Sequence, residues 1–95
     1  MNKETIDEQT CPVLARGVRL QHDAKTDEPV LLFPEGVLYL SATAEEIVSY
    51  CNGQTTAGAI ISLLAAEYEV EQETLRADVL ECLADLHQCK VLEFL

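Results

Sequence analysis

The hydrophobic pattern of this chain changes its period after Leu40, and that change constrains the fold more than any other feature. From Arg16 to Ser41, apolar residues alternate with polar ones or form short runs, which is typical of strands. After Thr43 they recur every three or four residues, which is typical of amphipathic helices. The chain is therefore predicted to be an α+β domain in which a small sheet precedes helices.

The strand-like part predicts a three-stranded antiparallel β-meander. A polar turn joins the first two strands, and Pro34-Glu35-Gly36 supplies a tight turn between the second and the third. So small a meander needs helices on one face to be stable. The three strands are expected around residues 18–22, 30–33 and 37–40.

Three α-helices are predicted after the meander. A capping box at Thr43 and Glu46 begins the first helix, and Asn52-Gly53 ends it with a left-handed cap. Either Thr55 or Thr56 caps the second helix. The apolar stripe of the second helix is expected to contain Ala57, Ile60, Ile61, Leu64 and Tyr68.

The third helix is predicted to be the longest, from about Gln72 to about Gln88. Residues 91–95 form either a short terminal strand or packed coil. The order of a three-stranded meander followed by three helices resembles a winged-helix domain. The first eleven residues lack a hydrophobic period, so we expect a flexible tail over 1–11 and one folded domain over 12–95.

The apolar arc of the third helix is wider than one core contact requires. One stripe contains Leu75, Val79, Cys82, Leu86 and Cys89, and a second flank contains Arg76, Leu80, Leu83, His87 and Lys90. In one interpretation, the leucines of the second flank pack on the other helices. In the other, they are exposed and, with Arg76 and His87 at the edge, form the wall of a groove for an amphipathic peptide.

The charge of the chain restricts its partners. Seventeen acidic residues against six Lys and Arg give a formal net charge of −11. Binding to duplex nucleic acid or to an anionic membrane surface needs a basic patch, so we expect neither partner. No apolar run approaches the length of a membrane span, and residues 1–10 do not form a secretory signal, so a cytoplasmic location is expected.

No arrangement of reactive residues predicts an enzyme. The glycines stand singly, which excludes a glycine-rich phosphate loop, and neither histidine lies in a motif. The cysteines Cys11, Cys51, Cys82 and Cys89 lack C-x-x-C spacing, and we expect small buried thiols without a metal. We therefore expect no enzymatic activity and no cofactor.

Four segments together resemble the PqqD family, the small peptide chaperones of pyrroloquinoline quinone (PQQ) biosynthesis. The resemblance runs from about Pro12 to about Leu92. Its most specific part is the turn LLFPEG followed by the helix-ending CNG. The four segments are 14–20, 30–37, 40–44 and 51–55.

The resemblance implies a winged-helix peptide-recognition module. Such modules bind the leader of a ribosomally made precursor peptide, here PqqA, and present it to the radical SAM enzyme PqqE. The strand edge would supply main-chain hydrogen bonds and the helix flank apolar pockets. The expected peptide-binding residues are Val37, Leu38, Tyr39 and Leu40 of the third strand and Arg76, Leu80, Leu83 and His87 of the third helix.

Some members of this family are also linked to binding of the quinone product. Two alternatives stay open: a PqqD-like module of another ribosomal peptide pathway, or a winged-helix regulator without a basic DNA-reading surface. The oligomeric state is open as well, because an open strand edge favours a homodimer whereas the acidic surface opposes one.

Overall fold

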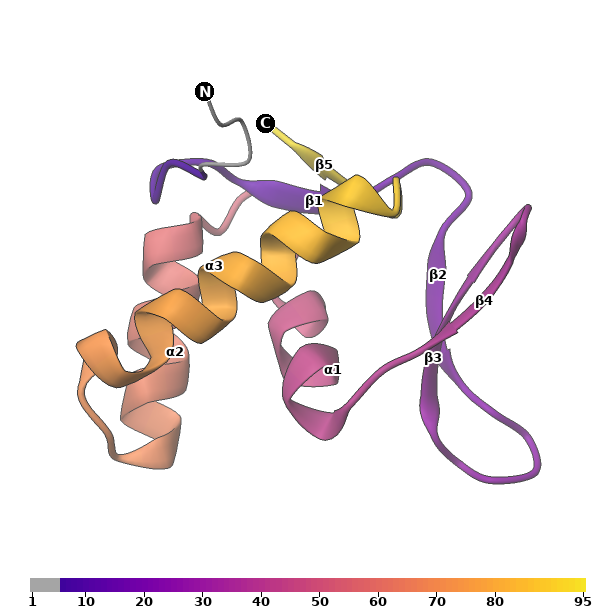
Figure 1. Ribbon diagram of the computed structural model, residues 1–95, viewed down its shortest axis with the longest axis horizontal. Helices are drawn as coiled ribbons and strands as arrows, with labels where there is room; N and C mark the ends of the chain where they lie inside the picture. Colours follow the sequence, from indigo (N-terminus) through magenta and orange to yellow (C-terminus); the bar gives the residue numbers. More distant parts are fainter. Residues whose placement is uncertain (1–5) are drawn as a thin grey trace.

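The computed structural model describes residues 6–95, and its strands precede its helices as predicted, except for a short strand at the end (Figure 1). The predicted meander corresponds to β2, β3 and β4, so the α+β class is confirmed. The elements are β1 (Pro12–Leu14), β2 (Arg19–His22), β3 (Pro29–Phe33), β4 (Gly36–Tyr39), α1 (Ala42–Ser49), α2 (Ala57–Tyr68), α3 (Gln72–Gln88) and β5 (Leu92–Phe94).

The strands form two separate antiparallel sheets. One has the order β2-β3-β4, and the other pairs β1 with β5, with Pro12 opposite Phe94. The strand over 92–94 settles the alternative left open for the end of the chain. Sequence reasoning missed β1, because a strand of three residues has no readable alternation and its partner lies at the far end of the sequence.

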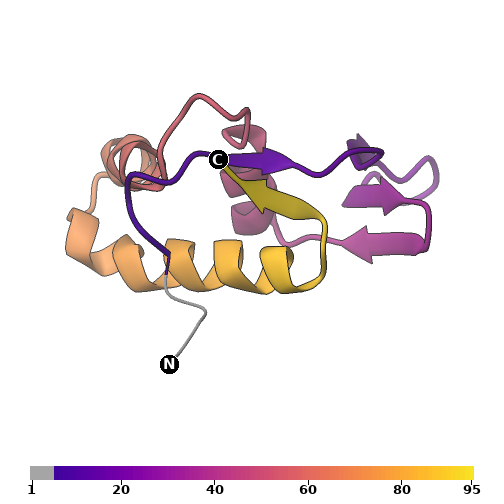
Figure 2. The ribbon, with the colours of Figure 1, turned by 90° about the horizontal axis from the view of Figure 1, so that it is seen from above.

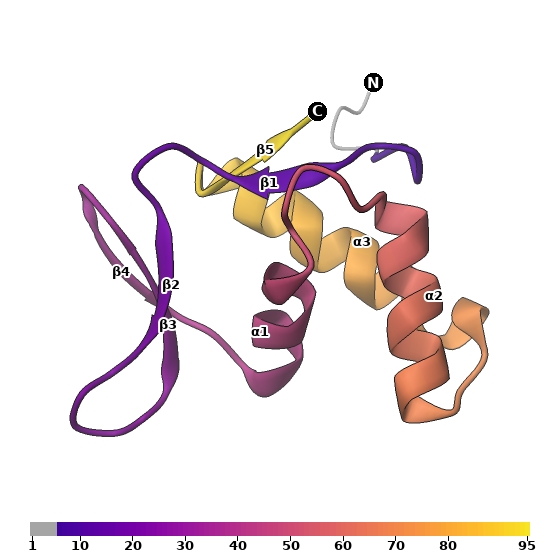
Figure 3. The same ribbon diagram turned by 180° about the vertical axis from the view of Figure 1, so that it is seen from behind.

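Helix α1 lies between the β2-β3-β4 sheet and the pair formed by α2 and α3, as the front and rear views agree (Figure 1 and Figure 3). Leu31 of β3 and Ile47 of α1 are almost completely buried in one core with residues of the other two helices. The main contributors from α2 and α3 are Ile60, Ile61, Leu64, Val79, Leu83 and Leu86.

The ends of α1 differ from the predicted ones. The N-cap is Ser41, whose Oγ accepts a hydrogen bond from the backbone N–H of Ala44 at 3.0 Å, so the predicted cap Thr43 lies inside the first turn. The helix ends at Ser49, before Asn52. Gly53 does take a left-handed conformation (φ +80°), and its N–H donates to the carbonyl of Pro12. The Asn-Gly pair therefore directs the chain along β1 rather than capping the helix.

The predicted bounds of α3 are confirmed, but its buried stripe is centred differently. Val79, Leu83 and Leu86 are buried, whereas Cys89 is exposed. In α2, Thr56 is the cap, and Tyr68 is exposed although we expected it on the buried stripe.

Residues 6–11 pack against the helices, although we expected them to belong to a flexible tail. Ile6 is buried, and the carbonyls of Glu8 and Thr10 accept hydrogen bonds from Gly58 and Ala57, each at 2.8 Å. These carbonyls thus satisfy backbone N–H groups at the start of α2 that no helical partner can reach. Residues 1–5 of the expected tail lie outside the described residues.

Candidate functional site

The outer edge of β4 has no strand partner among the described residues. The N–H of Leu40 donates to the carbonyl of Pro29 at 2.9 Å, so this residue directs its main-chain groups toward β3. Because hydrogen-bonding direction alternates along an antiparallel strand, Val37 and Tyr39 direct theirs away from the sheet. The edge thus offers main-chain donors and acceptors at two positions.

The two sheet faces of β4 have different surroundings. Val37 and Tyr39 are 51% and 55% exposed, while Leu38, opposite Leu31, and the following Leu40 are half-buried against the core. The hydroxyl of Tyr39 donates to Asp23 at 2.8 Å. The backbone N–H of Lys25 and this hydroxyl together hold the pKa of Asp23 below its ordinary value. The edge strand is thereby fixed to the turn between β2 and β3.

The flank of α3 that we predicted to face a peptide is engaged within the chain. Leu83 is fully buried rather than exposed, and Leu80 is half-buried. The guanidinium of Arg76 pairs with Glu8 and, at 3.2 Å, with Glu73. The ring of His87 stacks on Phe94 with centroids 4.2 Å apart.

The prediction for this flank is therefore wrong in one respect: it does not present exposed leucines. Leu83 packs in the core, while Glu8 and Phe94, which lie near the two ends of the sequence, contact Arg76 and His87. A helical wheel contains no information about such distant segments. We refer to this side, with Arg76, Leu80, Leu83 and His87, as the covered flank of α3.

The opposite side of α3 is hollowed and open to solvent among the described residues. The hollow has a volume of about 290 Å³ and is lined by Asp78, Glu81, Cys82, Asp85 and Leu86. Figure 2 shows α3 and β4 along the same side of the molecule, with β4 lying beyond the C-terminal end of the helix. We refer to these five residues as the open flank of α3.

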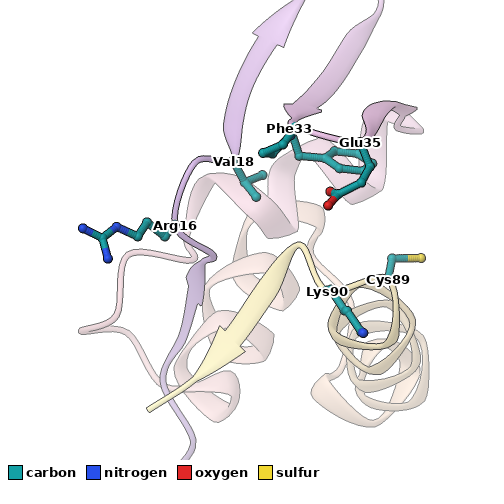
Figure 4. A pocket seen from close by; sticks show the side chains of 7 residues that line it. Arg16, Val18, Phe33, Glu35, Cys89 and Lys90 are labelled. Atoms are coloured by element: carbon teal, nitrogen blue, oxygen red, sulfur yellow. The ribbon is translucent and has the colours of Figure 1, made fainter.

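A larger hollow of about 490 Å³ lies where the end of α3 meets the turn between β3 and β4 (Figure 4). Phe33 and Val18 contribute apolar side chains, and the carboxylate of Glu35 points into the space between the turn and the helix end. Arg16 points away from it. The full lining is Arg16, Val18, Phe33, Pro34, Glu35, Cys89 and Lys90.

The four thiols differ in accessibility, whereas we expected all of them to be buried. Cys51 is buried and Cys82 is half-buried, and burial raises their pKa values to about 12 and about 11. Cys11 is half-buried and Cys89 is exposed. Cys89 is the C-cap residue of α3 and borders the larger hollow.

None of the helices in residues 6–95 combines the length and the apolar character needed to cross a bilayer. A model of the family described as "Coenzyme PQQ synthesis protein D (PqqD)" matches residues 28–92. The chain is 39% identical over 88 residues to a protein of Xanthomonas campestris named "PqqA binding protein", covering 93% of this chain and 96% of the relative. A protein of the same name from Bradyrhizobium diazoefficiens is 35% identical, covering 86% and 80% of the two chains.

Two solved structures are similar to this fold. One is the solution structure of the PqqD part of Methylobacterium extorquens PqqCD, with a TM-score of 0.82 and 33% identity, covering 95% of this chain and 96% of that chain. It is described as a functional, stand-alone recognition element for ribosomally synthesized and post-translationally modified peptides. The other is the crystal structure of PqqD from Xanthomonas campestris, with a TM-score of 0.59 and 38% identity, covering 94% and 99%.

Proposed function

Because this chain belongs to the PqqD family, we propose that it is a non-catalytic peptide chaperone of PQQ biosynthesis that binds the precursor peptide PqqA. The name of its Xanthomonas relatives and the description of the Methylobacterium structure support peptide binding. The observation that carries the proposal is the edge of β4, where Val37 and Tyr39 direct main-chain groups outward.

An extended segment of the peptide would add a strand to this edge. Its backbone would exchange hydrogen bonds with Val37 and Tyr39, as in other complexes formed by strand addition. Its side chains would alternate between the two faces of the enlarged sheet, so every second one would lie on the side of Leu38 and Leu40. Of the two flanks of α3, the open flank would be the one available to the peptide, because Leu83 is buried and Arg76 and His87 are engaged within the chain.

Titration calorimetry with synthetic PqqA of Xanthomonas campestris tests the function. We expect a dissociation constant between about 1 and 100 μM, which corresponds to a binding free energy of roughly −8 to −5.5 kcal/mol. Heteronuclear NMR of the same titration should show the largest shift changes at residues 36–40. Absence of binding at millimolar peptide would contradict a role in this pathway and favour a module that serves another peptide.

Two substitutions of one residue separate strand addition from side-chain contact. Val37→Pro removes an N–H that points away from the sheet, which an edge strand tolerates, and we expect it to weaken PqqA binding more than tenfold. Val37→Ala keeps the N–H and shortens the exposed side chain, and we expect a change of less than about threefold. Equal losses in the two variants would argue against main-chain pairing. Circular dichroism of each variant verifies that the fold is intact.

We further propose that the bound peptide is presented to the radical SAM enzyme PqqE. Membership of the family supports this step, and binding along one edge leaves the remainder of the peptide free for an enzyme. In size-exclusion chromatography, PqqE and this chain should co-elute more strongly when PqqA is present. Co-elution that is independent of PqqA, or lacking in its presence, would contradict presentation.

A further inference from the structure

We infer that the segment of the bound peptide facing the open flank of α3 carries Lys or Arg between apolar residues. The inference rests on the proposed function and names the chemistry of the peptide that the site selects. The basic side chains of α3 that could favour an acidic peptide, Arg76 and His87, lie on the covered flank. The side chains that border the open hollow are mainly carboxylates.

The spacing of these carboxylates places them in one row. Asp78, Glu81 and Asp85 are three and four residues apart, so they share one side of the helix over two turns. All three are exposed, and none of them lies within ion-pair distance of a basic side chain among residues 6–95. Burial raises the pKa of the Cys82 thiol, and the nearby carboxylates of Asp85 and Glu81 add to this increase. All three acids of the row border the same hollow as Cys82.

The apolar residues near the hollow indicate which other side chains the peptide carries. Cys82 and Leu86 lie between the carboxylates, and the half-buried Leu38 and Leu40 lie on the core-facing side of β4. A peptide strand that buries apolar side chains here would place its flanking residues near the acidic row. Opposite charge is the favourable choice at these flanking positions, because like charges at short range repel. An acidic peptide would meet a surface that is already strongly negative, since the chain has a net charge of −11.

The test compares two double variants that remove the same charge. Asp78→Asn/Asp85→Asn neutralises two of the three acids of the row, and Glu69→Gln/Glu71→Gln neutralises two exposed acids in the connection between α2 and α3. With Xanthomonas PqqA in calorimetry at 50 mM NaCl, we expect the first variant to bind about three- to tenfold more weakly, since exposed ion pairs contribute modestly. The control should change less than twofold. At 500 mM NaCl the wild type should lose most of its advantage over the first variant.

Peptide variants locate the partner charges. Each Lys or Arg of PqqA is replaced in turn by norleucine or citrulline, and a double-mutant cycle with Asp78→Asn/Asp85→Asn measures the coupling. At least one basic residue should couple, with a loss that the double variant abolishes. The inference is overturned if no basic residue couples, if both protein variants lose equal affinity, or if neutralising the row strengthens binding. If the wild type binds PqqA and one of these results is found, only the inference fails and the proposed function stands. If the wild type does not bind PqqA, the inference and the proposed function both fail.

Discussion

The two flanks of α3 have opposite relationships to the rest of the molecule. The covered flank carries Arg76 and His87, whose partners are Glu8 near the start of the chain and Phe94 near its end. The open flank carries three carboxylates and a half-buried thiol beside a hollow. The helix therefore uses one side to contact residues near both ends of the chain, and among residues 6–95 it leaves the other side accessible, on the side of the molecule where β4 lies beyond the helix end.

This difference explains why the more basic flank is the less suitable one for a peptide. A charged side chain can recognise a ligand only if its present partner can be displaced at small cost. Arg76 holds two carboxylates, and its hydrogen bonds to Glu8 and Glu73 raise its pKa. The exposed acids of the open flank need no displacement of a described neighbour. The structural role of the covered flank and the binding role proposed for the open flank can be tested separately.

The largest effect is expected at Leu83, the fully buried residue of the covered flank. Leu83→Ala should lower the free energy of unfolding by about 2–5 kcal/mol, because it leaves a cavity among α1, α2 and α3. Urea denaturation measures this loss. Under conditions where the variant is folded, its affinity for PqqA should remain within twofold of the wild type. A folded variant of unchanged stability that binds the peptide poorly would instead place Leu83 in the peptide groove.

The sequence predicted α3 accurately but not the division of its surface. Its bounds follow from local periodicity, as do the buried positions of α2 from Ala57 to Leu64. Which flank of α3 is covered depends on residues 6–11 and on β5, and their contacts join sites far apart in the sequence. The wheel therefore placed Leu83 on a second flank beside the main apolar stripe, whereas the packing buries it in the core.

The β4 edge was more predictable than the helical part of the site. Residues 37–40 alternate, follow a tight turn and precede a helix, so a last strand of a meander was expected there. Among residues 6–95 the two remaining strands, β1 and β5, pair with each other, and the outer edge of β4 has no strand partner. Ser41 and Thr43 both fit a helix cap by sequence, and the choice depended on where β4 ends.

The reactivity of the thiols should distinguish exposed from buried positions, and we expect differences of intermediate size. At pH 8 Cys89 should react with Ellman's reagent at least about tenfold faster than Cys82 or Cys51, since Cys89 is exposed and the thiolate is the reactive form. With pKa values of about 11 and about 12, Cys82 and Cys51 are almost entirely protonated at this pH. Raising the pH from 8 to 9 should speed the Cys82 reaction about tenfold, because its thiolate fraction rises tenfold below the pKa.

Bound PqqA should slow the modification of Cys82 more than that of Cys51, because Cys82 lies on the open flank. A Cys11→Ser/Cys89→Ser variant leaves only Cys51 and Cys82 and serves as the background for this measurement. Equal protection of both thiols would indicate general stabilisation of the fold. No protection of Cys82 at saturating peptide would mean that the peptide does not cover the open flank.

The smallest effect is expected for Arg76, where the covered flank meets residues 6–11. Arg76→Ala removes the pairing with Glu8, and the hydrogen bond from Gly58 to the carbonyl of Glu8 should then open more often. Native-state hydrogen exchange should show a few-fold faster exchange at Gly58, with little change at the core residue Ile61.

Lys90→Ala, which removes a cation just after α3, serves as the matched control and should leave Gly58 unchanged. Peptide affinity should stay within twofold in both variants, since neither cation lies on the open flank. A marked loss of affinity in Arg76→Ala alone would indicate that the covered flank takes part in peptide binding. It would contradict the different roles that we assign to the two sides of α3.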